Sequence, residues 1–414
     1  MSDLVLGESV EVLLDHRGKT PRKLGADFTV TGVPVVSAML VSNGMLDLNG
    51  VRFVSEETHR KWMPAPTKAG DVLLTSEAPL GRVAIVPNDE PLVLGQRLFC
   101  LRGSKGVLDS RYLFYSLQTK AVQADLLGRA TGTTVVGIRQ AALRRVRIPA
   151  PPFHDQCAIA EVLGALDDKI AANARLNSTI DALSLSLWEK LDSEATGSAQ
   201  SVAEIITTAV AGDWGVTVPT PTEVCDVLCV RGADVADLQF FGQGNMPNRF
   251  IKAASLAKRQ LAAGDVVVEM SGGSPTQSTG RAIYVGQSLL RRFDRPIVSS
   301  NFCRRVRTAP GLSVYFYHMM RSLWSRGVFF QYENGTTGIK NFGFQEFCTN
   351  HQIIIPLMPD LERFSARVER SYDFGQALAE QSRVLAALRD ALLPALMSGR
   401  LRVKDAERQV EEVL

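Results

Sequence analysis

The sequence predicts an α+β protein with an internal repeat, in which a mixed domain followed by one long helix occurs twice. Two kinds of pattern lead to this prediction. Over residues 151–191, seam residues recur at alternating three- and four-residue steps, which is typical of a long helix with a narrow coiled-coil seam. A second run of this kind follows Pro359. The segment before each run is β-rich and is divided by turn residues.

The first long helix has a well-marked start. Proline is tolerated in a first helical turn because its missing N–H would be unpaired there, and Asp155 and Glu161 are acids near the positive end of the helix dipole. The seam consists of Ile159, Leu163, Leu166, Ile170, Asn173, Asn177, Ile180 and Leu187, with a break near Ser184. Because buried asparagines on a seam fix register and orientation, we expect a structural role for the two in this helix.

The second long helix lies near the end of the chain. Its seam consists of Leu361, Phe364, Val368, Gly375, Leu378, Leu385, Leu392 and Leu396. Gly399 is a stop signal after the last of these residues. Two narrow-seamed helices in one chain most simply pack against each other.

The segments before the two helices share one order of features. Arg52 and Phe53 recur 197 positions later as Arg249 and Phe250. Further matches are Gly70 and Asp71 with Gly264 and Asp265, Gly81 and Arg82 with Gly280 and Arg281, Tyr112 with Tyr315, Gly132, Thr133 and Thr134 with Gly335, Thr336 and Thr337, and Ile148, Pro149 and Pro152 with Ile355, Pro356 and Pro359. The offset drifts between 194 and 207 positions. This pattern indicates two copies of one unit.

Several local elements can be placed within the copies. In the first copy we expect strands at residues 33–39, 72–75, 82–86 and 98–102, and an amphipathic helix at 110–127. In the second copy, a strand at 302–306 would put Arg305 and Arg307 on one face and Arg304 on the other. Residues 192–200 are small and polar, which suits a linker.

Length and composition limit the class of protein. A chain of 414 residues favours two or more domains, and a net charge of +3 means that any nucleic-acid surface must come from local clustering. The six cysteines show neither disulfide-framework nor zinc spacing, so we expect reduced, mostly buried thiols. No apolar run reaches about 18 residues and the start lacks a signal-peptide pattern. We therefore expect a soluble, cytoplasmic protein without membrane contact.

Several motifs resemble those of the specificity (S) subunits of Type I restriction-modification systems. They are Arg17, Gly18, Lys19, Thr20 and Pro21; Gly70, Asp71, Val72 and Leu73; Gly95, Gln96 and Arg97; Ile148, Pro149, Ala150, Pro151 and Pro152 followed by Gln156; Leu392 and Leu393; and Ser398, Gly399, Arg400 and Leu401. In this order the motifs cover nearly the full chain. The second copy departs from the pattern, because it has Ser299, Ser300 and Asn301 in place of the Gly-Gln-Arg triplet and lacks the double proline and the glutamine before its helix.

The resemblance implies an architecture and a role. It implies α/β target-recognition domains at residues 1–149 and 194–356, separated by two long antiparallel coiled-coil-like helices at 150–193 and 357–400, with a tail at 401–414. Each domain would read one half of a split double-stranded DNA target. The chain would dock two modification (methyltransferase) subunits, which carry S-adenosylmethionine, and restriction (endonuclease/translocase) subunits. The chain itself would catalyse nothing and would bind neither cofactor nor metal.

A permuted DNA amino-methyltransferase is the enzymatic alternative. The run Ala150-Pro151-Pro152-Phe153 is similar to the catalytic loop of such enzymes, and Phe241-Gly242-Gln243-Gly244 is similar to their methyl-donor loop. However, an Asn or Asp side chain is needed at the position of Ala150 to accept hydrogen bonds from the target amino group. Pro247 also blocks a helix directly after Gly244, whereas a nucleotide-type glycine turn presents a helix N-terminus. A non-catalytic scaffold that binds protein is the other alternative, and it would show no salt-dependent DNA binding.

Candidate DNA contacts are basic, amide and hydroxyl side chains in glycine-rich or arginine-rich segments, because such groups bind base edges and phosphates. We predict contacts by Arg17, Lys19, Arg22, Lys23, Thr133, Thr134 and Arg139 in the first domain, and by Gln277, Arg281, Arg305, Arg307, Thr336, Thr337 and Lys340 in the second. For the loops, a plain surface connection or a shared structural turn is the alternative. For the arginines near residues 291–307, the alternative is a solvated surface.

Overall fold

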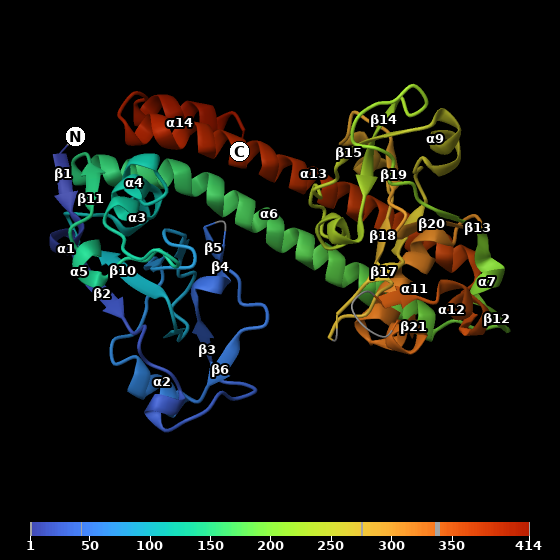
Figure 1. The fold of residues 1–414 in the computed structure, drawn as a ribbon, viewed down its shortest axis with the longest axis horizontal. Coiled ribbons are helices and arrows are strands. Elements are labelled where there is room, and N and C mark those ends of the chain that lie inside the picture. The colour runs from blue at the N-terminus through green and yellow to red at the C-terminus, as the bar shows by residue number, and fades with distance from the viewer. Residues whose placement is uncertain (1, 43, 275, 336–339, 414) are drawn as a thin grey trace. The chain divides into compact units, whose positions relative to one another are not determined.

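The computed structural model describes residues 2–42, 44–274, 276–335 and 340–413 (Figure 1). The chain forms two compact units. The first comprises residues 1–169 with 384–414, and the second comprises residues 170–383. The boundary falls inside both long helices, so each of these helices continues from one unit into the other.

The first unit is built on a four-stranded antiparallel sheet, two strands of which, β2 and β10, are labelled in Figure 1. The strand order is β2 (Val10–Asp15), β10 (Leu98–Gly103), β7 (Val72–Thr75) and β8 (Val83–Ile85). A smaller sheet has the order β6 (Arg52–Val54), β3 (Val33–Val36) and β9 (Val93–Leu94), and two strand pairs join β1 (Ser2–Val5) to β11 (Arg147–Ala150) and β4 (Val41–Ser42) to β5 (Met45–Leu46). The short helices are α1 (Leu6–Ser9), α2 (Glu56–Trp62), α3 (Ser110–Ser116), α4 (Lys120–Gly128), α5 (Gln140–Leu143) and α14 (Val403–Glu411).

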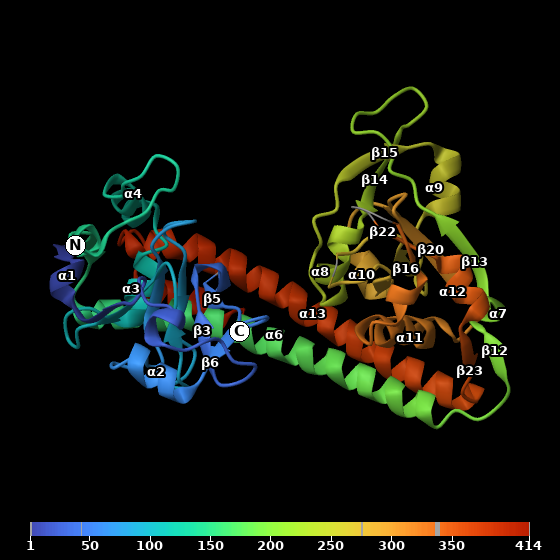
Figure 2. The ribbon, with the colours of Figure 1, turned by 60° about the horizontal axis from the view of Figure 1, so that its bottom comes forward.

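The second unit also has a four-stranded antiparallel sheet (Figure 2). The strand order is β13 (Ile206–Ala211), β20 (Cys303–Thr308), β16 (Val266–Glu269) and β18 (Ala282–Tyr284). The smaller sheets have the orders β15 (Asn248–Ile251), β14 (Cys225–Val230), β19 (Ile297–Ser299); β17 (Ser271–Gly272), β22 (Lys340–Phe342), β21 (Glu333–Asn334); and β12 (Ala199–Ser201), β23 (Gln352–Ile354). The short helices are α7 (Val202–Ile205), α8 (Val235–Gln239), α9 (Ala253–Arg259), α10 (Gln287–Arg291), α11 (Ser313–Ser325) and α12 (Phe344–Asn350).

Strand order confirms the internal repeat. Taken in chain order, β2, β7, β8 and β10 of the first copy correspond to β13, β16, β18 and β20 of the second, and the two main sheets arrange them identically. Each copy also has a three-stranded sheet with one antiparallel and one parallel strand pair. The repeated Gly-Asp motif has one structural role in both copies, because Asp71 accepts a 2.6 Å hydrogen bond from Arg102 and Asp265 accepts one of 2.6 Å from Arg307.

The two long helices are α6 (Phe153–Ser193) and α13 (Met358–Met397), with 41 and 40 residues. In the second unit, the buried Asn173 of α6 donates to the Gln381 side chain of α13 at 3.0 Å. Further along α6, Leu187 shares a surface hollow with Phe364 of α13. Residue numbers therefore rise along one helix as they fall along the other, and the helices pack antiparallel.

The seam of α6 differs from the prediction in its last turns. Ser184 and Trp188 are 2% and 4% exposed, whereas Leu187 is only partly buried. An α-helix has 3.6 residues per turn, so a seam spaced at 3.5 drifts by about 20° per heptad. At Ser184, where the apolar spacing breaks, the hydroxyl donates to the Ile180 carbonyl at 2.7 Å and is satisfied within the helix, so α6 continues through this position.

Several other predicted elements have different bounds. The strands predicted at residues 33–39, 82–86 and 98–102 are β3 (Val33–Val36), β8 (Val83–Ile85) and β10 (Leu98–Gly103). The helix predicted at residues 110–127 is two helices, α3 and α4, because the Thr119 side chain accepts from the Val122 N–H and caps the second. The strand predicted at 302–306 is β20, which starts one residue later and ends two residues later. Residues 401–414, predicted as a tail, contain α14, whose Ala406 and Val410 are buried.

Most of the six cysteines are buried, as predicted, and all six are free. Four are buried, namely Cys100, Cys229, Cys303 and Cys348. Burial raises the pKa of Cys229 and of Cys303 to about 12, which keeps both thiols protonated and unreactive. Within the described residues, no helix combines the length and apolarity that crossing a bilayer requires.

Candidate DNA interface

Residues 17–23 of the first unit contain four candidate cations, and two of them are engaged inside the domain. The Arg17 guanidinium pairs with the Asp15 carboxylate at 2.7 Å. Lys19 donates from Nζ to the Trp62 carbonyl at 2.6 Å. These contacts hold the loop against the domain. Both side chains therefore have a structural role.

Arg22 and Lys23 are the exposed cations of the same loop. The Arg22 side chain is 90% exposed and its Nε lies 3.7 Å from the Asp27 carboxylate. Lys23 donates from Nζ to the Gly18 carbonyl at 2.8 Å. Exposed contacts of this kind contribute little free energy in water, so both cations can turn to a phosphate.

The loop continues into a groove of about 530 Å³ on the first unit. The groove is lined by cations, an amide and apolar side chains, among them Lys19, Arg52, Arg97, Gln96, Phe28 and Met39. The Arg52 guanidinium lies 3.9 Å from the centroid of the Phe28 ring. Cations with amide and apolar groups are what a surface needs to contact both phosphates and base edges.

The Gly-Thr-Thr loop of the first unit is exposed. Thr133 and Thr134 lie at its tip, and Arg139 is exposed just after it. Two backbone hydrogen bonds of 2.8 and 3.0 Å between Thr131 and Gly137 close the loop. The closed loop holds both threonine hydroxyls in a defined turn at the surface. The motif can therefore form a structural turn and contact DNA at the same time.

In the second unit, one candidate is exposed and two are paired with carboxylates. Gln277 is exposed. Arg281 donates to Glu269 at 2.6 Å, and Lys340 donates to Glu333 at 2.7 Å. The candidates Thr336 and Thr337 lie outside the described residues. Both paired cations hold strands or loops of the domain together, so we leave them out of the proposed interface.

Arg305 and Arg307 on β20 are also engaged within the domain. Arg305 is 6% exposed, and burial followed by the charge of Arg307 lowers its pKa. Arg307 pairs with Asp265 at 2.6 Å, and this hydrogen bond raises the pKa of Arg307. Since Arg102 and Asp71 form the same pair in the first unit, the duplicated contact is structural. We therefore leave both arginines out of the interface as well.

The sequence reading missed two arginine–aromatic stacks. Arg52 lies 3.9 Å from the ring centroid of Phe28, and Arg249 lies 3.9 Å from that of Trp214. In the sequence, the two arginines are only one of the matches that mark the duplication. Their ring partners are 186 positions apart, whereas the arginines are 197 apart, so no alignment of the copies at one offset reveals the shared stack.

The loops that resembled a methyltransferase lack the groups that methyl transfer needs. Gly244 already donates its N–H to the Asp237 carboxylate at 2.6 Å, and this negative charge would repel the carboxylate of a methyl donor. Ala150 is buried on β11, where it pairs with Ser2. Within the described ranges, no cluster of His, Cys, Asp and Glu could hold a metal ion.

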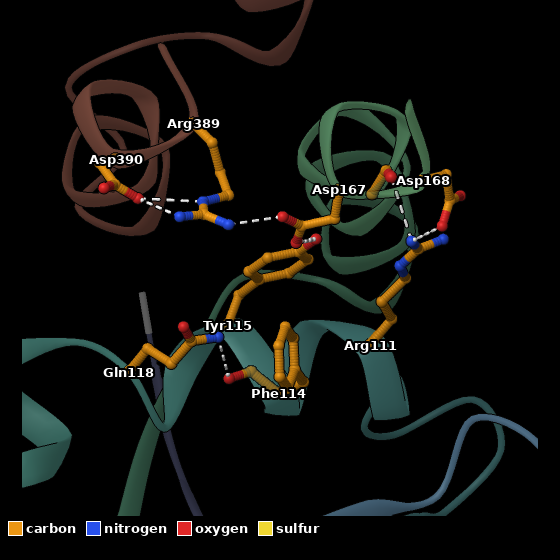
Figure 3. A network of polar contacts seen from close by, with 9 residues as sticks. Arg111, Phe114, Tyr115, Gln118, Asp167, Asp168, Arg389 and Asp390 are labelled. Carbon is orange, nitrogen blue, oxygen red and sulfur yellow. Dashed lines mark hydrogen bonds and ion pairs between the residues drawn. The ribbon is translucent and has the colours of Figure 1, made fainter. Parts of the chain in front are cut away.

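A polar network in the first unit fastens α3 to both long helices (Figure 3). Tyr115 of α3 donates to Asp167 of α6 at 2.6 Å, and Arg389 of α13 donates to the other Asp167 oxygen at 2.6 Å. Arg111 of α3 donates to Asp168 at 2.6 Å. Burial, followed by the negative charge of Asp167, raises the pKa of Tyr115, so its hydroxyl remains a donor. The domain of this unit is thus bound directly to the helix pair.

Comparison with known proteins decides between the alternatives. Residues 4–182 match the family model described as "Type I restriction modification DNA specificity domain". The chain is 26% identical over 373 residues to the Type I restriction enzyme MjaIX specificity subunit of Methanocaldococcus jannaschii, covering 86% of this chain and 83% of that one. These similarities support a specificity subunit of a Type I restriction-modification system. This confirms the resemblance of its motifs.

Two further comparisons agree. The chain is 28% identical over 163 residues to the MjaVIII specificity subunit of Methanocaldococcus jannaschii, covering 38% of each chain. The fold is similar to that of the Type I restriction-modification S subunit from M. genitalium, with a TM-score of 0.53, 14% identity and 95% coverage of both chains. A specificity subunit is the non-catalytic, DNA-specific part of its complex, and S-adenosylmethionine binds the methyltransferase subunit.

Proposed function

We propose that this specificity subunit reads a split double-stranded DNA target, with one half-site for each domain. The observation that carries the proposal is the duplicated strand order, because two copies of one recognition fold can each read a short segment. The long helices provide the necessary length. At about 1.5 Å per residue, the 41 residues of α6 extend about 60 Å, which corresponds to about 18 base pairs at 3.4 Å each.

In the proposed interface, exposed groups contact DNA while paired cations shape the loops that carry them. The contacts in the first domain are Arg22, Lys23, Thr133, Thr134 and Arg139 together with the groove, and Gln277 is a contact in the second domain. Arg17, Lys19, Arg281 and Lys340 position these loops through their intrachain partners. Thr336 and Thr337 stay predictions from the sequence.

We also propose that the long helices dock two modification subunits, and that restriction subunits join the same complex. Leu176 and Leu183 of α6 and Phe374 of α13 are 45%, 44% and 54% exposed. Large apolar side chains on a helix surface lose contact with water when a partner covers them. The free cysteines fit assembly in a reducing cytoplasm.

Exchanging residues 201–356 for the matching domain of another specificity subunit is expected to change one half of the methylated motif. The second domain would then read new bases while the first domain is unaltered. Methylome sequencing of cells that carry the exchanged subunit with its partners measures this directly. Changes in both halves of the motif would contradict one-domain, one-half-site reading.

The double substitution Arg22→Ala/Lys23→Ala is expected to weaken binding of the assembled complex to cognate and unrelated DNA alike. Each lost phosphate contact lowers the slope of log K against log salt by about one, so the slope should fall by about two. Fluorescence titration at several salt concentrations measures the slope. Lys105→Ala removes an exposed cation outside the groove and should leave the slope unchanged. Equal slopes for both variants would remove Arg22 and Lys23 from the interface.

A further inference from the structure

The two recognition domains share an arginine stacked on an aromatic ring. Arg52 lies on β6 and Arg249 on β15, which occupy the same edge position in the corresponding three-stranded sheets. In both cases the ring belongs to the segment that precedes the central strand of that sheet. This segment pairs with the edge strand just after the arginine, through the bridges of Thr29 with Phe53 and of Val216 with Phe250. The stack is therefore a duplicated feature of the fold.

Both guanidinium groups keep their hydrogen-bond donors unused. Among the described residues, neither Arg52 nor Arg249 has a carboxylate or carbonyl partner, and the Arg249 Nε is buried without any acceptor. Two other stacked arginines differ in this respect, since Arg17 and Arg321 pair with carboxylates, whereas Arg304, 5.5 Å from the Phe344 ring centroid, also has a buried Nε without an acceptor. For Arg249, a buried donor without an acceptor costs free energy, and a ligand that supplies acceptors would relieve this cost. Arg52 is exposed, so its donors are open to a ligand.

Stacking also fixes the plane of each guanidinium. Arginine has five N–H donors in a rigid planar fork and no acceptor. A ring against one face leaves the N–H groups at the edge of the plane free to point outward. Among the bases, guanine alone presents two neighbouring acceptors, O6 and N7, in the major groove, whereas adenine presents one acceptor and one donor there. Phosphate neutralisation needs no such fixed plane, and the exposed cations already serve it.

We propose that Arg52 and Arg249 are corresponding specificity-determining side chains, each of which donates two N–H groups to O6 and N7 of a guanine in its own half-site. The inference rests on the proposed function and adds to it the base and the residue that reads it. Phe28 and Trp214 are positioning residues, because they act only through the arginines that they hold.

The test uses the assembled complex with its modification subunits, whose methylome first defines the motif. Arg52→Ala is expected to reduce discrimination at one guanine of one half-site by about 5- to 150-fold, and Arg249→Ala to do the same in the other half-site. Arg60→Ala removes an exposed arginine of the same domain and should leave the motif unchanged. Phe28→Leu keeps Arg52 but frees it, so the same guanine should lose discrimination to a smaller degree.

A modified duplex tests the contact at the level of atoms. Replacing the guanine by 7-deazaguanine removes N7, which should weaken binding by the unsubstituted complex and leave binding by the Arg52→Ala complex unchanged. Arg52→Lys keeps the positive charge but lacks the planar fork of N–H donors, so this variant should lose discrimination at the guanine. If Arg52→Ala fails to fold, Arg52→Lys tests the contact in its place.

Two results would overturn the inference. A uniform loss of affinity with a salt slope lower by about one, rescued by lysine, would make the arginines phosphate contacts. An unchanged motif would remove them from recognition altogether. In both cases exchange of residues 201–356 would still alter one half of the motif, so failure of this inference is distinguishable from failure of the proposed function, which predicts the split itself.

Discussion

Lengthening both long helices by four residues is expected to widen the unread gap in the DNA target by one or two base pairs. Four helical residues add about 6 Å, and a base pair adds about 3.4 Å. The insertions are placed between Lys169 and Ile170 of α6 and between Arg383 and Val384 of α13, where each helix passes from one compact unit to the other. The bases read within each half-site should stay the same. Methylome sequencing of the variant gives both quantities at once.

The position of the insertions follows from the packing of α6. Sequence alone favours a site near the end of that helix, between Leu187 and Ser193. There, however, Trp188 is buried in the core of the second unit, and Asp192 accepts a 2.6 Å hydrogen bond from Tyr315. An insertion at that point would displace both contacts. It would then report on folding and not on spacing.

The length of the insertion provides its own control. Four residues keep each helix within about 40° of its original phase, so the seam can still pack. Two residues turn each helix by about 200° and should abolish assembly. An active four-residue variant with an unchanged gap would show that the length of the helices does not set the distance between the two half-sites.

The duplicated architecture was predictable because its signals are local and occur twice. Helical seams depend on spacing along one segment, and 41- and 40-residue helices give that spacing many repetitions. The Gly-Asp motif was found by its recurrence, although its reason appears only in the fold, where Asp71 meets Arg102 across 31 residues of sequence. Recurrence of a motif in both copies therefore predicts a structural role before its contacts are known.

The DNA interface was less predictable because the availability of a cation depends on its partners in three dimensions. Arg307 reaches Asp265 across 42 residues of sequence, and no pattern in the segment around it announces that contact. Glycine-rich and basic segments therefore do not separate an exposed cation such as Arg22 from a cation such as Arg281 that is already paired with a buried carboxylate. Arg52 shows the same limit, because its guanidinium, stacked on the Phe28 ring, is recognised only in the fold.

Removing the Asp181 carboxylate is expected to destabilise the second unit strongly. The side chains of Asp181 on α6 and Arg321 on α11 are 11% and 10% exposed. Arg321 donates to both carboxylate oxygens, one of them at 2.7 Å. Asp181→Ala leaves a buried guanidinium without its counter-charge, which costs about 3–5 kcal/mol. For a unit of this size, the Tm should fall by about 6–20 °C.

Two further variants separate this ion pair from the general effect of losing a charge on α6. Asp168→Ala breaks a pair on the same helix whose side chains are 70% and 35% exposed, and exposed pairs contribute at most about 1 kcal/mol, so its Tm should fall by less than about 4 °C. Replacing both buried partners, as Asp181→Leu/Arg321→Leu, removes the unpaired charge and should recover most of the lost stability. Differential scanning calorimetry of the assembled complex measures all three. If Asp181→Ala melts within a few degrees of Asp168→Ala, water reaches the Arg321 guanidinium, and the pair does not anchor α11 to the long helix.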